Sequence, residues 1–145
     1  MEVKCSCFRN GEMLDKRYTC DGKDINPRLA LGNIPPETKT LALIMDDPDA
    51  PGGDFVHWVV FDIPVTKIIE EDSIPGKQGL NDFKRMDYGG PCPPSGTHRY
   101  FFKIYALDEI LNLEEGVTKS SLENAMVGHT LAQAEIMGLY RKKEK

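Results

Sequence analysis

Two apolar runs on either side of a polar turn dominate the middle of the chain. Residues 41–45 and 55–63 are almost wholly apolar, whereas residues 46–53 are acidic and rich in proline and glycine. Apolar runs bounded by such residues predict buried strands. Because Pro48 and Pro51 fix the backbone φ, we expect a rigid turn between the strands rather than a flexible linker.

A second turn rich in proline and glycine, residues 88–98, leads into another strand. Residues 99–107 are aromatic and β-branched, and their alternation places one set of side chains on a single face. That set is Tyr100, Phe102, Ile104 and Ala106. Each of the two turns stands beside a histidine at a strand, so we expect them to form two walls of one pocket.

The N-terminal third has weaker patterns. Short strands are expected over residues 2–9 and 28–31, and residues 19–27 are dense in turn formers. A calcium loop is excluded because glycine and glutamate are missing at the required positions. We expect hydrogen bonds from the side chains of Asp21 and Asn26 to the backbone there instead.

The C-terminal half is predicted to contain a long loop and one or two short helices. Residues 67–78 are polar and broken by proline and glycine, which favours a loop. Ser120 and Glu123 have the spacing of a capping box, for a helix that ends near Gly128. The composition of residues 130–140 favours a second helix. Short strands with few helices indicate a mainly β fold, an antiparallel β-sandwich or barrel.

Composition narrows the function classes. A length of 145 residues suits a single domain, and the net charge of −5, with basic residues clustered only in the tail 141–145, argues against nucleic acid as partner. That tail is expected to be a solvated end. We expect no membrane insertion, since no apolar run is long enough, and a cytoplasmic location, since no apolar leader precedes the first strand.

Cysteine spacing allows two interpretations. Four thiolates from Cys5, Cys7, Cys20 and Cys92 could bind zinc, but only one closely spaced pair is present, whereas the usual zinc sites have two. Free thiols in a reducing compartment are the preferred interpretation, with no metal and no cofactor.

Three motifs together resemble one known family. They are residues 47–51 (DPDAP), 57–60 (HWVV) and 90–100 (GPCPPSGTHRY), with weaker similarity at 18–22, 105–108 and 128–132. In this order they resemble the phosphatidylethanolamine-binding protein (PEBP) family, in its short bacterial and archaeal branch. The resemblance implies a β-sandwich of two sheets with a small pocket for phosphate-like or carboxylate-like anions at one edge. It also implies strand or mixed structure for residues 130–140.

An anion pocket needs hydrogen-bond donors that are fixed in advance. We expect imidazole N–H groups and the backbone N–H groups of Gly89 and Gly90 to supply them. Asp47 either holds a histidine in the donating tautomer or contacts a ligand ammonium group, which would suit phosphoethanolamine. The candidate ligand-binding residues are Asp47, Pro51, His57, Gly90, Pro91, His98 and Tyr100.

Residues near these candidates are given structural roles. Asp49 is expected to brace its own turn, and Arg99 to pair with a carboxylate at the sandwich edge. Tyr88 is an alternative to Tyr100 as pocket wall, and His129 is expected to be structural.

The sequence is compatible with three functions. The first is a non-catalytic binding protein for small anions or phospholipid headgroups, which could also dock a phosphorylated protein partner. The second is a protein-interaction role, as a serine-protease inhibitor acting through the loop 67–78 or as a kinase-pathway modulator. The third is an enzyme with Asp47 and His57 as an acid–base pair, but Ser95 and Cys92 lack any motif for a nucleophile.

Overall fold

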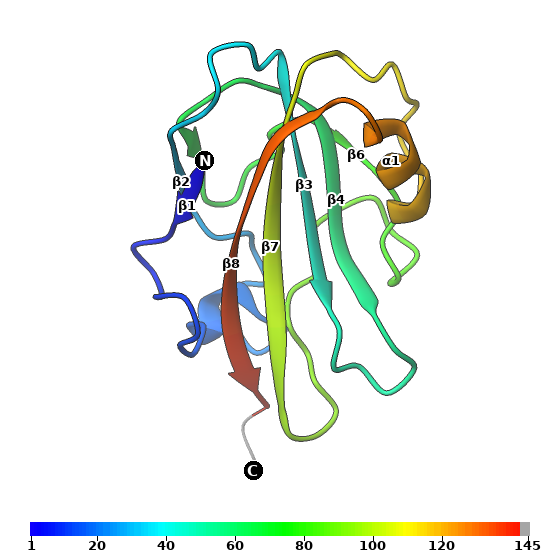
Figure 1. Ribbon diagram of the computed structural model, residues 1–145. Coiled ribbons are helices and arrows are strands. Elements are labelled where there is room, and N and C mark those ends of the chain that lie inside the picture. The colour runs from blue at the N-terminus through cyan, green and yellow to red at the C-terminus, as the bar shows by residue number, and fades with distance from the viewer. Residues whose placement is uncertain (143–145) are drawn as a thin grey trace.

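Five antiparallel strands form the main sheet of the protein. In a computed structural model, which describes residues 1–142, these strands lie side by side across the molecule (Figure 1). Residues 143–145, the last part of the predicted solvated tail, lie outside this description. In order across the sheet the strands are β6 (Lys77–Gln78), β4 (Phe55–Pro64), β3 (Thr40–Asp47), β7 (Thr97–Leu107) and β8 (Thr130–Arg141).

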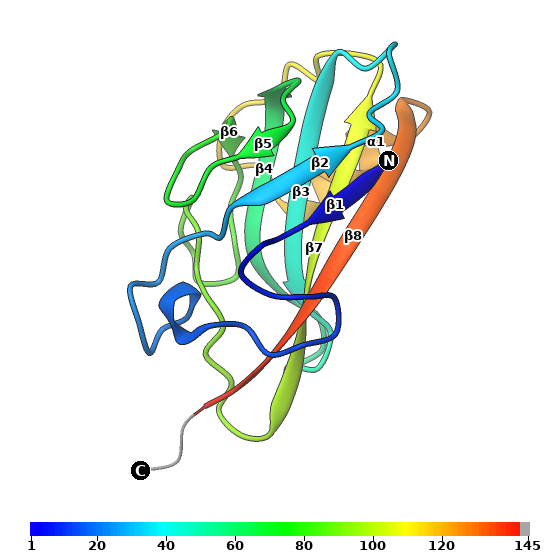
Figure 2. The same ribbon diagram turned by 90° about the vertical axis from the view of Figure 1, so that its left-hand side faces the viewer.

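A small sheet covers one face of the main sheet. Figure 2 looks onto this small sheet with the large one behind it. The core between the two layers contains Leu29 and Leu31 from the small sheet and Trp58, Tyr100 and Phe102 from the large one. This arrangement confirms the predicted two-sheet sandwich. The strands of the small sheet are β1 (Glu2–Lys4), β2 (Leu29–Gly32) and β5 (Ile68–Ile69).

A second, smaller core lies on the opposite face of the large sheet, beneath the helix α1 (Lys119–Met126). Leu122 and Met126 of this helix pack on Ile44, Val59 and Phe61. Both faces of β3 and β4 are therefore buried, which explains why their sequences are continuous apolar runs. Within residues 1–142, no helix is long and apolar enough to cross a membrane.

The strongest predicted strand is confirmed. β7 pairs with β3 and β8, and the four residues that alternation placed on one face are each at most 1% exposed. The helix that composition favoured over residues 130–140 is wrong, because these residues form β8, which pairs with β7 from Thr130 to Arg141. Burial of Ile136, Gly138 and Tyr140 follows the two-residue period of a strand. Gly138 is needed there because a Cβ atom would lie 2.7 Å from Leu14 Cγ.

The N-terminal strand is shorter than predicted. β1 ends at Lys4 because the chain bends at a disulfide between Cys5 and Cys7, where the Cys7 backbone N–H donates to Cys5 Sγ. A single turn of 3-10 helix, η1 (Lys16–Tyr18), follows before β2.

The segment 67–78 is more ordered than the predicted loop. It contains β5, which pairs with β2, and β6, which pairs with β4. Asn26 also attaches to it, because its side-chain oxygen accepts from the Ser73 N–H and its amide donates to the Glu70 carbonyl. The hydrogen bonds expected of Asn26 are therefore present, although Asp21 accepts from the Tyr140 hydroxyl rather than from backbone.

The helix α1 begins before the predicted capping box. Its N-cap is Thr118, whose hydroxyl accepts from the Ser121 N–H at 3.2 Å, and Ser120 lies within the helix. The helix ends at Met126, close to the predicted end at Gly128, which has a φ of +80°.

Replacing Thr118 by alanine should lower the free energy of unfolding by about 1 kcal/mol, because it leaves an N–H group of the first turn without its acceptor. Ser120→Ala is the matched control and should change stability little, since Ser120 is exposed and alanine favours helix. Urea denaturation of both variants measures the difference. A larger loss for Ser120→Ala would contradict this assignment of the cap.

Candidate functional site

The two predicted turns enclose one cavity at the end of the large sheet. The cavity has a volume of about 160 Å³ and is lined by residues of the β3–β4 turn and of the loop that leads into β7. Both of these segments lie toward the lower end of Figure 1. It is smaller than the roughly 300–1,000 Å³ of pockets for drug-sized ligands. Its lining residues are Asp47, Ala50, Pro51, Phe55, His57, Phe83, Cys92, Pro93, Pro94, His98 and Tyr100.

Asp47 joins the two turns through His98. The Asp47 carboxylate, which is 3% exposed, accepts from His98 Nδ1 at 2.7 Å. Its other oxygen accepts from the Asp49 backbone N–H at 2.7 Å. Since a carboxylate only accepts, Nδ1 of His98 carries a proton and Nε2 is left for a ligand. Of the two roles predicted for Asp47, the geometry favours the one that fixes the histidine tautomer.

His57 is fixed in the same way by a different acceptor. Its Nδ1 lies 2.7 Å from the Gly89 carbonyl oxygen, so this nitrogen also donates. The ring is 3% exposed, and burial lowers the pKa of His57 below its usual value. A neutral His57 presents Nε2 as an acceptor, whereas the protonated ring presents it as a donor. Asp47 bonds His98, so the two residues considered as an acid–base pair, Asp47 and His57, are not hydrogen-bonded to each other.

Aromatic rings surround His57. Its ring centroid lies 5.1 Å from that of Phe55, 5.2 Å from Phe83 and 5.3 Å from Tyr100, each in an edge-to-face arrangement. Burial, with the charge of Asp47, raises the pKa of Tyr100, so its hydroxyl stays protonated. No sequence pattern marked Phe83 as a residue of the cavity, because it stands in an irregular segment outside both turns.

Gly89 and Gly90, the glycine turn, do not line the cavity but hold its wall residues in place. The Gly89 N–H donates to the His57 carbonyl at 3.2 Å, and the Gly90 N–H donates to Asp24 at 2.7 Å. Neither N–H group is free for an anion, so the role predicted for this turn as a donor is wrong. Gly90 and Pro91 do not line the cavity.

Tyr88 also serves the scaffold rather than the cavity. Its hydroxyl donates to the Tyr18 carbonyl at 2.7 Å, which fastens this turn to the last residue of η1. Glycine is required at position 90 because a Cβ atom there would lie 2.4 Å from the Tyr18 carbonyl oxygen.

A surface ion pair reinforces the contact between the two turns. Asp49 accepts from the Arg99 backbone N–H and from two guanidinium nitrogens, each at 2.9 Å. This contact lowers the pKa of Asp49 to about 2, chiefly through the hydrogen bond from the Arg99 side chain. Arg99 thus has the carboxylate partner that was predicted, whereas Asp49 braces the opposite turn rather than its own.

The neighbouring carboxylate, Asp46, belongs to the other face of the sheet. It accepts from Lys103 at 3.1 Å and from Lys119 at 3.0 Å, on the side covered by α1. Alternation along β3 therefore separates Asp46 from the cavity and leaves Asp47 as its acidic residue.

The cysteines form two disulfides, Cys5–Cys7 and Cys20–Cys92. The prediction of free thiols is therefore wrong, and no thiolate set for zinc remains among the described cysteines. Cys92 lines the cavity, but its sulfur is bonded and offers no nucleophilic thiolate.

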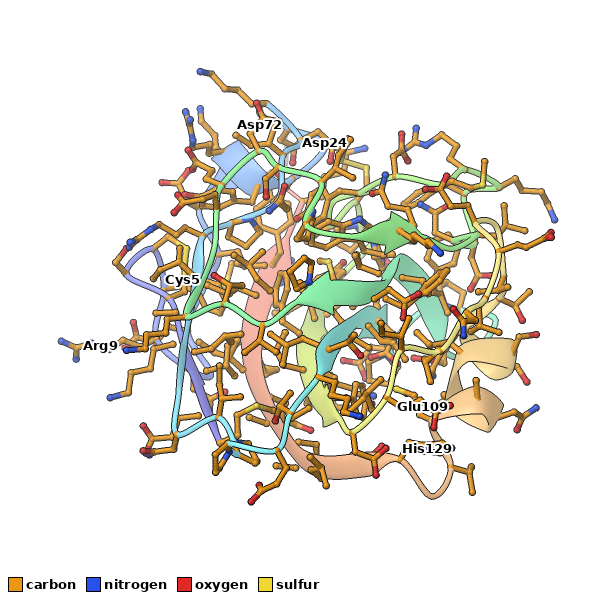
Figure 3. The ribbon with its side chains drawn as sticks, turned by 90° about the horizontal axis from the view of Figure 1, so that it is seen from above. Cys5, Arg9, Asp24, Asp72, Glu109 and His129 are labelled. Carbon is orange, nitrogen blue, oxygen red and sulfur yellow. A yellow bond between two sulfur atoms is a disulfide. The ribbon has the colours of Figure 1, made fainter. Side chains whose placement is uncertain are left out.

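One cluster could hold a metal ion at the opposite end of β7. Glu109 and His129 lie side by side near α1 (Figure 3), and Asp108 joins them within 4.8 Å. His129 Nδ1 lies 3.0 Å from Asp108 and 3.3 Å from Glu109. All three side chains are at least 35% exposed, and an ion pair between the imidazole and the carboxylates accounts for their contacts.

The charge of the cavity depends on its histidines. Among the described residues, no lysine or arginine lines it, and Asp47 is already paired with His98. Any positive charge offered to a ligand must therefore come from protonated imidazole. Two ring nitrogens, Nε2 of His57 and Nε2 of His98, remain to bind a small polar group between aromatic and proline walls.

Comparison with known proteins places this geometry in a family. The model of the family described as "Phosphatidylethanolamine-binding protein" matches residues 4–141. A UPF0098 protein of Aquifex aeolicus is 53% identical, over 98% of this chain and 89% of its own length. A UPF0098 protein of Methanothermobacter thermautotrophicus is 46% identical, over 98% of this chain and 99% of its own length.

Solved structures agree with the sequence relatives. A Chlamydia trachomatis protein described as a PEBP homologue superposes with a TM-score of 0.95 at 42% identity, over 98% of this chain and 97% of its own. Escherichia coli YbcL, described as a member of the mammalian PEBP family, superposes with a TM-score of 0.88 at 30% identity, over 98% of each chain. The chain therefore belongs to the phosphatidylethanolamine-binding protein family, in agreement with its three motifs.

Proposed function

We propose that this protein is a non-catalytic binding protein whose cavity takes one small anionic group, a carboxylate or a phosphate. The observation that carries this proposal is the fixed orientation of two imidazoles: Nδ1 of His57 and of His98 donates to the protein, so Nε2 of each ring is left for a ligand. Family membership supports a binding role, and the cavity volume of about 160 Å³ suits a headgroup rather than acyl chains.

Anion binding at such a site takes up a proton. Burial keeps His57 neutral near pH 7, and a neutral Nε2 accepts rather than donates. An anion beside this ring stabilises the imidazolium form and raises its pKa, so the bound state holds a proton that the free state lacks. Affinity should therefore increase as pH falls.

A phosphoethanolamine-like headgroup fits the same chemistry. Its phosphate would contact the two Nε2 atoms, and its ammonium group would lie near Phe55 at the cavity wall, since aromatic rings attract cations. Asp47 is less suited to this ammonium than the sequence suggested, because each of its oxygens already accepts a hydrogen bond. Docking of a phosphorylated protein would use the same two nitrogens.

Three observations support a non-catalytic role over an enzyme. Cys92 is in a disulfide, so it does not supply a thiolate. Ser95, the other nucleophile considered, does not line the cavity. Asp47 and His57, the expected acid–base pair, do not bond each other. Stable ligand binding without turnover of phosphoesters or peptides would support this part of the proposal.

The protease-inhibitor alternative has less support. It requires an exposed rigid loop that can enter a protease cleft, and residues 67–78 were the candidate. Strands β5 and β6 and the contacts of Asn26 attach this segment to the body of the protein. We therefore place it second, with a stoichiometric inhibition assay against serine proteases as its test.

The cytoplasmic location predicted from the sequence remains part of this proposal. The two disulfides bear on it, because their stability depends on the compartment. Disulfides persist in oxidising compartments and in the cytoplasm of hyperthermophiles, whereas an ordinary reducing cytoplasm opens accessible ones. In such a cytoplasm the state of the two disulfides would follow the local thiol pool.

Acetate should bind at least about tenfold more tightly at about pH 6 than at about pH 8, because one proton taken up on binding changes affinity by up to about tenfold per pH unit. Acetate is the suitable probe since carboxyl groups titrate near pH 4 and it stays ionised throughout this range. Titration followed by the imidazole NMR signals measures the affinity. Equal affinity at both values would contradict proton-linked binding to His57.

Replacing His57 or His98 by glutamine should each weaken acetate binding about tenfold or more, since each removes one of the two imidazoles whose Nε2 faces the anion. His129→Gln is the matched control, because His129 is the third histidine and lies at the far end of β7. It should leave affinity unchanged. Wild-type affinity in both cavity variants, with their fold intact by circular dichroism, would exclude this cavity as the site.

A further inference from the structure

The wall of the cavity formed by residues 92–94 is attached to the rest of the protein by one covalent bond. Cys92, Pro93 and Pro94 all line the cavity. Within the part of the chain that the structure describes, residues 92–96 make no hydrogen bond to another segment. Among residues 1–142, the Cys20–Cys92 disulfide is the one bond that ties residues 92–96 to a distant segment, and the buried ring of Pro93 adds only packing contacts.

Just before this wall the chain is held by several hydrogen bonds. The Cys20 N–H donates to the Pro91 carbonyl at 3.1 Å, and the Gly90 N–H donates to Asp24 at 2.7 Å. These bonds do not depend on the sulfur atoms. Opening the disulfide would therefore leave Gly90 and Pro91 in place and release the segment that follows.

After reduction, residues 92–96 would move as a segment with little internal flexibility. Pro93 and Pro94 fix their own backbone φ, so the segment would not collapse into many conformations. Gly96, with φ +70°, offers the point where it can swing before β7 begins. His98 follows directly, and its bond to Asp47 would remain, so the change is loss of a wall rather than loss of the imidazoles.

We propose that the Cys20–Cys92 disulfide is a thiol-exchange site that sets the shape of the cavity, and that its reduction by a cellular dithiol weakens ligand binding. This inference rests on the proposed anion-binding function. Both cysteines are exposed, so a thiolate can reach their sulfur atoms. The bond closes the cavity wall onto the segment after η1, across a sequence separation of 72.

The exchange is a two-electron step. A thiolate of the dithiol attacks one sulfur, the bond between Cys20 and Cys92 breaks, and a mixed disulfide forms with release of the other cysteine as a thiolate. The second thiol of the reductant then displaces the bound cysteine and closes its own disulfide. The two cysteines gain two electrons and two protons, and the dithiol loses the same number.

The second disulfide of the chain provides a matched control. Cys5 and Cys7 are separated by two positions, and neither lines the cavity. In a Cys5→Ser/Cys7→Ser variant the bond between Cys20 and Cys92 is the one disulfide left, so oxidised and reduced forms of this variant differ only there.

The test is acetate titration at about pH 6 of this variant, before and after treatment with dithiothreitol. The oxidised variant should match wild type. Reduction should weaken binding about threefold or more, because the released wall must then be ordered when the ligand binds. A Cys20→Ser/Cys92→Ser variant should behave like the reduced form without any reductant.

Equal binding by the oxidised and reduced variant would overturn the inference. Loss of the β7 amide signals on reduction would also overturn it, because the disulfide would then be a staple of the fold. Failure of oxidised wild type to bind acetate is a separate outcome, and it would overturn the proposed function instead.

Discussion

The site depends on the hydrogen bond from His98 to Asp47. This 2.7 Å contact joins the two turns that form the cavity, and both partners are buried. A hydrogen bond to a charged group contributes about 1.5–3 kcal/mol, whereas a buried carboxylate that loses its partner costs about 3–5 kcal/mol. The Asp49–Arg99 pair lies beside it at the surface and connects the same two turns. The contact between the two turns and the orientation of His98 therefore have one common cause.

The same constraint explains why the proposed anion pocket can contain an aspartate. Asp47 directs its charge toward Nδ1 of His98, so it orients a donor instead of facing the ligand. Gly89 gives His57 the same orientation with a neutral carbonyl, and aromatic neighbours keep that ring desolvated. One imidazole thus has a charged partner and the other a neutral one. In the proposed function an anion completes the second pair, which would make binding depend on pH.

Sequence patterns predicted the parts of the structure that depend on local composition. Strands β3, β4 and β7 followed from apolar runs that end at proline and glycine, and the meeting of the two turns followed from a histidine beside each. The helix predicted from the composition of residues 130–140 was wrong. Pairing of β8 with β7, not the propensity of its residues, decides the conformation of this segment. Phe83 and the Cys20–Cys92 bond join segments far apart in the chain, and no local pattern records such contacts. The N–H groups of Gly89 and Gly90 were wrongly predicted to bind the ligand. A loop sequence does not show that these groups already have hydrogen-bond partners within the protein.

The tautomers of the two cavity histidines in the free protein test this account most directly. Long-range proton–nitrogen NMR spectra distinguish Nδ1–H from Nε2–H imidazole. At about pH 8, where an unperturbed histidine is neutral, both His57 and His98 should be the Nδ1–H form, with Nε2 unprotonated and open to a ligand. An Nε2–H tautomer at either residue would mean that Gly89 or Asp47 does not accept from that ring. Nε2 would then already be a donor in the neutral ring, and the proposed anion binding would not need to take up a proton.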